Sequence, residues 1–62
     1  MINYLFEFVN EYSILCGERI FIQCNSKEEA DKIIDENFWS DGLVCLGEYS
    51  DEEAEAMGYD TY

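Results

Sequence analysis

The chain carries two runs of closely spaced carboxylates. In the first, Glu28, Asp31 and Asp35 are three and four residues apart, so on a helix their side chains share one face about 5–6 Å from one another. The second run consists of Asp51, Glu52, Glu53 and Glu55. Carboxylates arranged in this way can transfer protons, hold a metal ion or present negative charge to a basic partner.

Acid–base catalysis is the first of these options, and it requires a pocket that raises the pKa of one carboxyl group of a pair. The carboxylates here fall on the polar sides of the helices in which we place them, where we expect no burial. The chain also has no histidine and no GxGxxG, P-loop, GxSxG or HExxH pattern. We therefore predict that the protein is not an enzyme.

A calcium site fails on the spacing of its ligands. Asp35 and Asn37 begin a stretch that partly resembles an EF-hand loop. Counted from Asp35, the fifth position is Trp39 instead of an oxygen ligand, and the sixth is Ser40 instead of glycine. Without histidine there is also no zinc site that contains an imidazole. We predict no metal site and no cofactor.

Three cysteines, Cys16, Cys24 and Cys45, match neither a CxxC pair nor a disulfide framework. We expect them to be small buried side chains in a reducing compartment. The chain has no signal-peptide pattern, and no apolar run approaches about 20 residues. These features predict a cytoplasmic protein that does not enter a membrane.

Composition indicates one small acidic domain over residues 1–62. Hydrophobic residues make up 48% of the chain and aromatic residues 16%, more than in a disordered acidic tail. Fifteen Asp and Glu against three Lys and Arg give a formal net charge of −12. Because nucleic acids and anionic membranes are bound through Lys and Arg, this charge argues against direct binding to either.

Two stretches near the start of the chain predict paired strands. Residues 2–9 alternate between two faces, and the second face, with Leu5 and Val9, is only half polar, as in a central strand. Residues 19–24 predict a second strand. The polar residues between them predict a hairpin, whose turn lies either at residues 10–13 or at residues 16–18.

A capping box, Ser26 with Glu29, predicts the start of the main helix. Its buried stripe follows at helical spacing and consists of Ala30, Ile33, Ile34 and then Asn37 or Phe38. Residues 43–46 predict a short third strand.

A second capping box, Ser50 with Glu53, predicts a short helix over residues 51–57 that Gly58 ends. With only about two turns, this helix needs packing through Ala54 and Met57 to persist.

The order strand, strand, helix, strand, helix predicts an α+β fold. We expect a three-stranded antiparallel sheet in the spatial order 2-1-3, with the main helix packed on one face. Leu5, Val9 and Phe21 then lie on the other face. Either the C-terminal helix and tyrosines or a second copy of the chain must cover them.

The acidic excess is concentrated in the later part of the chain. Residues 26–62 hold twelve acids against Lys27 and Lys32, a net −10, whereas residues 1–25 hold three against Arg19, a net −2. Solubility of a small domain needs a net charge of only about 2–8, and excess charge of one sign destabilises the folded state. We therefore expect the carboxylates to imitate a phosphate backbone and to occupy the groove of a basic nucleic-acid-binding protein or complex.

In its short length, charge and acidic runs over residues 28–36 and 48–55, the chain resembles small acidic inhibitors of host defence from phages and mobile elements. These are the anti-CRISPR proteins and the DNA-mimic anti-restriction proteins. The resemblance covers the chain as a type and includes no motif. It implies that the two carboxylate runs named above act as phosphate surrogates that block a nuclease or surveillance complex.

Exposed aromatic residues support an alternative hypothesis, an acidic regulatory or adaptor module without nucleic-acid mimicry. Trp39 and Tyr59 are the expected anchors, because Trp and Tyr are enriched at the energetic centres of interfaces. A homodimer is also open, since small domains without disulfides or metals often gain stability by association.

Overall fold

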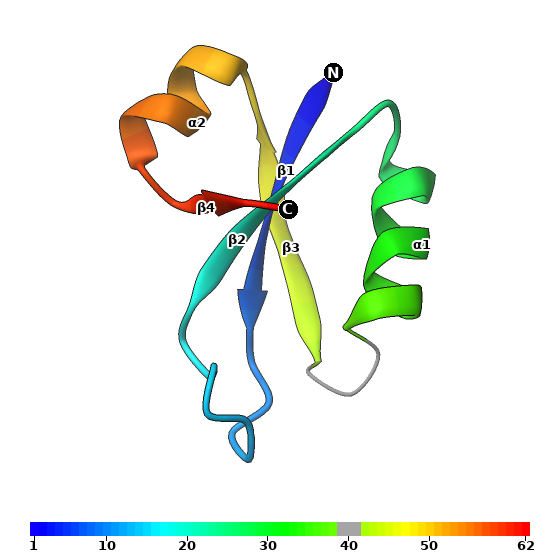
Figure 1. Ribbon diagram of the computed structural model, residues 1–62, viewed down its shortest axis with the longest axis vertical. Coiled ribbons are helices and arrows are strands. Elements are labelled where there is room, and N and C mark those ends of the chain that lie inside the picture. The colour runs from blue at the N-terminus through cyan, green and yellow to red at the C-terminus, as the bar shows by residue number, and fades with distance from the viewer. Residues whose placement is uncertain (39–41) are drawn as a thin grey trace.

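Two helices lie on opposite sides of a four-stranded sheet in the computed structural model, which describes residues 1–38 and 42–62 (Figure 1). The elements in chain order are β1 (Ile2–Phe8), β2 (Arg19–Cys24), α1 (Lys27–Asn37), β3 (Leu43–Tyr49), α2 (Asp51–Met57) and β4 (Asp60–Thr61). The strands lie in the order β3-β1-β2-β4. The predicted α+β class and the order of the first three strands are therefore confirmed.

The prediction of three strands, antiparallel throughout, is wrong in one respect. β4 pairs in parallel with β2, with Ile20 opposite Asp60 and Phe21 opposite Thr61, so the sheet is mixed. β4 has only two residues and no apolar alternation, which is why the sequence gives no sign of a strand there. Contacts on either side of β4 fix its place: the Tyr59 ring packs against Phe21 of β2, and the Tyr62 ring packs against Phe38 at the end of α1. The Tyr62 N–H also donates to the Phe21 carbonyl at 2.8 Å.

Strand boundaries also differ from those predicted. β1 ends at Phe8 instead of Val9, and β3 continues to Tyr49 instead of ending at residue 46. The pairing of β1 with β3 shifts by one residue between Leu5 and Phe6. At this bulge Gly47 has φ 153°, a backbone conformation that favours glycine. The bulge lets β3 remain paired beyond the point where the apolar run stops.

The face of the sheet covered by α1, here called the first face, holds the main core. Its buried members are Tyr4, Phe6, Ile22, Cys24 and Ala30. Ile33, Ile34 and Phe38 of the predicted stripe pack against them. Asn37 is exposed and donates its side-chain amide to the Ile33 carbonyl, so Phe38 is the last member of the stripe.

The opposite face, here called the second face, is covered by the C-terminal segment. Leu5 and Phe21 are fully buried there, and the Phe21 ring lies 6.0 Å from that of Tyr49 and 6.1 Å from that of Tyr59. Val9 remains exposed. α2 lies over this face but buries no residue: Met57 is exposed, so the predicted packing through Met57 is wrong.

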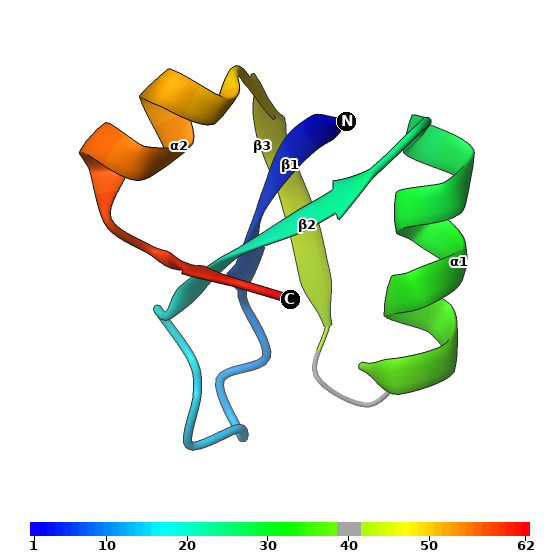
Figure 2. The same ribbon diagram turned by 45° about the horizontal axis from the view of Figure 1, so that its top comes forward.

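Residues 9–18 connect β1 to β2 and project from one end of the sheet (Figure 2). Both of the predicted turn regions bend, since the Ser13 N–H donates to the Asn10 carbonyl and the Glu18 N–H to the Leu15 carbonyl. Cys16 lies in this connection and is exposed, so the expectation that all three cysteines are buried is wrong. Tyr12 and Ile14 at its tip are 90% and 100% exposed.

Candidate partner-binding surface

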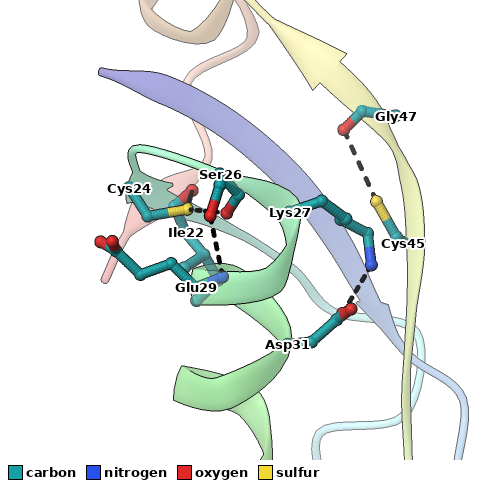
Figure 3. Close-up of polar contacts among 8 residues, drawn as sticks. All are labelled: Ile22, Cys24, Ser26, Lys27, Glu29, Asp31, Cys45 and Gly47. Carbon is teal, nitrogen blue, oxygen red and sulfur yellow. Dashed lines mark hydrogen bonds and ion pairs between the residues drawn. The ribbon is translucent and has the colours of Figure 1, made fainter.

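α1 begins where the sequence predicts, and its first turn is stabilised by a cap and by a hydrogen bond from a core side chain. The Ser26 hydroxyl accepts a hydrogen bond from the Glu29 N–H at 3.2 Å, and the buried Cys24 thiol donates to the Ser26 carbonyl at 3.2 Å (Figure 3). Because Ala30 faces the sheet, the predicted acidic residues of α1 face water. All three of them, Glu28, Asp31 and Asp35, are exposed.

Asp31 differs from its neighbours because it is paired within the chain. It forms an ion pair with Lys27, one turn earlier, and this bond raises the pKa of Lys27. The Lys27 ammonium also lies 5.5 Å from the centre of the Phe6 ring and reaches toward Cys45 on β3 (Figure 3). Asp31 thus has a cation beside it, whereas no ion pair among the described residues involves Glu28 or Asp35.

α2 carries the second predicted run, and its ends are held by the expected caps. The Ser50 hydroxyl accepts from the Glu53 N–H, and the Glu53 carboxylate accepts from the Ser50 N–H, each at 3.2 Å. Gly58 ends the helix with φ 74°. The four predicted carboxylates of this helix, Asp51, Glu52, Glu53 and Glu55, are all exposed, so α2 carries an acidic surface of its own.

A cavity of about 350 Å³ lies between α2 and the second face of the sheet. It brings together three of the predicted site residues, Asp51, Glu55 and Tyr59. Its wall also includes Asn3, which is buried and donates its side-chain amide to an Asp51 carboxylate oxygen at 2.7 Å. The cavity is therefore acidic on the α2 side and has a fixed amide at its base.

Asn3 was not singled out from the sequence as part of a site, nor were Gln23 and Thr61, which also line this cavity. A signal was present, because Asn3 is an amide near the start of a mostly apolar central strand, and buried amides need hydrogen-bond partners. What the sequence does not reveal is that this partner is a carboxylate 48 residues away.

Tyr59 has contacts inside the chain as well as an exposed side. Its hydroxyl accepts from an Arg19 guanidinium nitrogen at 3.3 Å, and Arg19 also pairs with Glu7 at 3.0 Å. Tyr59 therefore links β2 to the C-terminal segment while it remains 38% exposed. Trp39, the other predicted aromatic anchor, lies outside the described residues.

The predicted carboxylates form two separate acidic surfaces, not one. α1 and α2 lie on opposite sides of the sheet (Figures 1 and 2). Only the α2 surface borders the cavity. Ion pairs within the described residues engage Arg19 and Lys27, so most of the carboxylate charge is not compensated locally.

Neither helix, as far as the structure describes the chain, is long and apolar enough to cross a membrane. Among the same residues, no group of three or more potential ligands is placed to hold a metal ion. No protein-family model, curated protein or solved structure matches this chain, so its own geometry and charge are what a functional hypothesis must rest on.

Proposed function

We propose that the protein is a non-enzymatic inhibitor that binds the basic nucleic-acid-binding surface of a protein or complex and occupies it by mimicry. The observation that carries this proposal is that all seven predicted carboxylates are exposed and lie on two capped helices. Such an arrangement has a cost in self-repulsion, which a basic partner would relieve.

Charge density supports mimicry of a nucleic acid in particular. The longest dimension is 32 Å and the net charge is −12, which is about one net charge per 2.7 Å. A nucleic-acid duplex carries one charge per about 1.7 Å of axis, and each of its strands one per about 3.4 Å. The average spacing of net charge along the long axis of the protein falls between these two values.

The cavity beside α2 suits a single basic side chain of that partner. Asp51 and Glu55 supply carboxylates for a guanidinium or ammonium group, and the Tyr59 ring offers an aromatic wall. Its volume of about 350 Å³ accommodates one long side chain. We expect an Arg or Lys of the partner to occupy it.

The experiment neutralises those carboxylates of α2 whose removal breaks no hydrogen bond or ion pair among the described residues. Glu52 and Glu55 make no hydrogen bond or ion pair with described residues, whereas Asp51 bonds Asn3 and Glu53 completes the capping box. The test variant is therefore Glu52→Gln with Glu55→Gln. The matched control is Glu11→Gln with Glu18→Gln, which changes the net charge equally on the connection at the other end of the sheet.

Tagged wild-type protein and both variants are used to capture partners from nuclease-treated bacterial lysate, with washes at about 0.1 M and about 0.5 M salt. We expect a basic nucleic-acid-binding protein to be retained at low salt, released at high salt and displaced by added DNA. The α2 variant should retain roughly tenfold less than the control variant. Equal retention by the two variants, or indifference to DNA, would contradict mimicry.

The exposed tip of the β1–β2 connection favours one second candidate, the adaptor module. Tyr12 and Ile14 there are 90% and 100% exposed, and large apolar groups of this kind anchor protein interfaces. An adaptor that uses them would keep its partner at about 0.5 M salt and lose it on Tyr12→Ala with Ile14→Ala. Mimicry predicts that the same variant captures its partner normally.

A further inference from the structure

β3 forms one edge of the sheet, and within the described residues no strand pairs with its outer side. It is seven residues long, whereas the opposite edge is closed by the two-residue β4. A free edge presents unpaired N–H and C=O groups that can accept another strand, and proteins usually protect such edges with lysine or proline. β3 contains neither, and Glu48 is its only charged residue.

The register shows which backbone groups are available. The Val9 N–H donates to the Gly42 carbonyl at 3.0 Å, so Val9 and Gly42 form a hydrogen-bonded pair. Two residues further along the ladder, Glu7 lies opposite Val44. Because the backbone groups of successive residues in an antiparallel strand point to alternate sides, Val44 bonds toward β1. The N–H and C=O groups of Leu43 and Cys45 then point to the outer side, ready to continue the ladder.

The side chains beside this edge leave apolar and charged surface exposed to solvent. Val44 and Leu46 are 44% and 42% exposed, so an added strand would cover apolar surface as well as gain hydrogen bonds. Near the first face, Glu48 is exposed, and the Lys27 ammonium, which is paired with Asp31, reaches toward Cys45 (Figure 3). The edge thus combines apolar side chains with the Glu48 carboxylate and an ion pair that is already neutralised within the chain.

Charge decides what kind of strand fits. α1 covers the first face and α2 the second, and both helices are acidic, so a strand added at β3 has negative charge on either side of it (Figures 1 and 2). A second copy of the chain would bring another net −12 to this position. A basic segment would instead be attracted, and its strand pairing would be strengthened by the surrounding field.

We propose that the outer edge of β3 binds an extended basic segment of the partner protein as an added strand, with apolar side chains toward Val44 and Leu46 and a Lys or Arg toward Glu48. This inference rests on the proposed function for the sign of the partner's charge. Its hydrogen-bonding surface is distinct from the carboxylates of α2, so the two can be tested separately.

The probe is a peptide of about eight residues in which Val and Lys alternate, the pattern that a strand with one apolar and one basic face requires. Its control has the same side chains and charge but carries N-methyl groups on the backbone, so it cannot donate to an edge strand. Binding is followed by NMR on the labelled protein. We expect the unmodified peptide to shift the amides of Leu43 and Cys45 and to slow their hydrogen exchange, with at least about tenfold tighter binding than the control.

A protein variant provides an independent check. Leu46→Lys places a charge at the edge and should weaken peptide binding by about tenfold, whereas Ile14→Lys, with the same change on the exposed connection, should bind normally. If Leu46→Lys does not fold, the comparison of the two peptides on the wild-type protein still decides.

Four results would overturn the inference. The first three are equal binding of both peptides, no binding of either, and shifts confined to α2, which would leave the proposed function standing because it would place the basic peptide on the carboxylates of that helix. The fourth is protection of Leu43 and Cys45 that rises with protein concentration alone, which would assign the edge to a second copy. Failure of the proposed function would be recognised separately, by normal partner capture after removal of the Glu52 and Glu55 charges.

Discussion

The side-chain amide of Asn3 donates a 2.7 Å hydrogen bond to the carboxylate of Asp51 and so joins the buried start of β1 to the first turn of α2. Asn3 is only 2% exposed, while α2 buries no residue of its own. The position of α2 therefore depends on this bond, on its capping box and on the segment that follows it. Asp51 supports the fold and borders the cavity at the same time, so its removal would not report on partner contact alone.

The first prediction concerns this bond. Asn3→Ala and Asp51→Ala should each lower the free energy of unfolding by about 1–3 kcal/mol, because each leaves a polar group without its partner or removes a charge-assisted bond. In a double-mutant cycle the two changes should couple by about 1 kcal/mol. Urea unfolding measures all three variants. Glu52→Ala serves as the control and should stay within about 0.5 kcal/mol of wild type. Strict additivity of the two changes would show that the bond contributes nothing.

The second prediction concerns the end of α2. Gly58 has φ 74°, where a side chain is disfavoured, and a Cβ added there would meet no atom within 4 Å. Gly58→Ala should therefore cost about 1 kcal/mol through backbone conformation alone. Gly58→Asn should cost less, since asparagine tolerates the left-handed region. Thermal unfolding of the three proteins gives the comparison, and an alanine variant as stable as wild type would contradict the argument.

The main parts of the fold could be predicted because each follows from a local pattern. Ser26 and Ser50 mark the starts of both helices, and the stripe from Ala30 to Phe38 identifies the face that α1 buries. The apolar character of β1 on both faces places it in the middle of the sheet. In these elements the information lies within a few residues of chain.

The parts that could not be predicted depend on contacts between distant segments. β4 exists because Asp60 and Thr61 meet the edge of β2, and the bulge at Gly47 depends on how β3 meets β1. The cavity likewise needs Asn3 and Glu55 to lie together. A pattern of carboxylates identifies an acidic helix face, but only the packing reveals that the two acidic faces lie on opposite sides of the sheet.

The third prediction follows from the net charge of −12. Repulsion among the carboxylates destabilises the folded state, and monovalent salt screens it. Raising NaCl from about 0.02 M to about 0.5 M should stabilise the protein by about 1 kcal/mol, which raises the Tm by about 4–8 °C for a domain of this size. The variant with Glu11, Glu18, Glu52 and Glu55 all changed to Gln should respond less. A Tm that does not depend on salt would indicate that the carboxylates do not repel one another appreciably. Salt should also weaken partner binding, so the two effects have opposite signs.

The last prediction concerns alkaline pH. Burial raises the pKa of the Tyr4 hydroxyl, and the nearby charge of Glu48 acts in the same direction. Burial also raises the pKa of the Cys24 thiol. Both groups hold their protons more tightly in the folded protein than in the unfolded chain. Their contribution to stability is therefore fully present below the unfolded pKa values, about 8.5 for Cys and about 10 for Tyr, and is lost as the pH rises through the folded values.

We thus expect the urea midpoint to be constant between about pH 7 and 8 and to fall above about pH 9. Cys24→Ala should remove the earlier part of this fall and Tyr4→Phe the later part, because each takes away the group that loses its proton. Tyr12→Phe, on the exposed connection, is the matched control and should keep the wild-type pH profile. If Tyr4→Phe and Tyr12→Phe give the same profile, the hydroxyl of Tyr4 is not what makes the fold sensitive to alkali. The later part of the fall then comes from another group that loses its proton there, such as the Lys27 ammonium paired with Asp31.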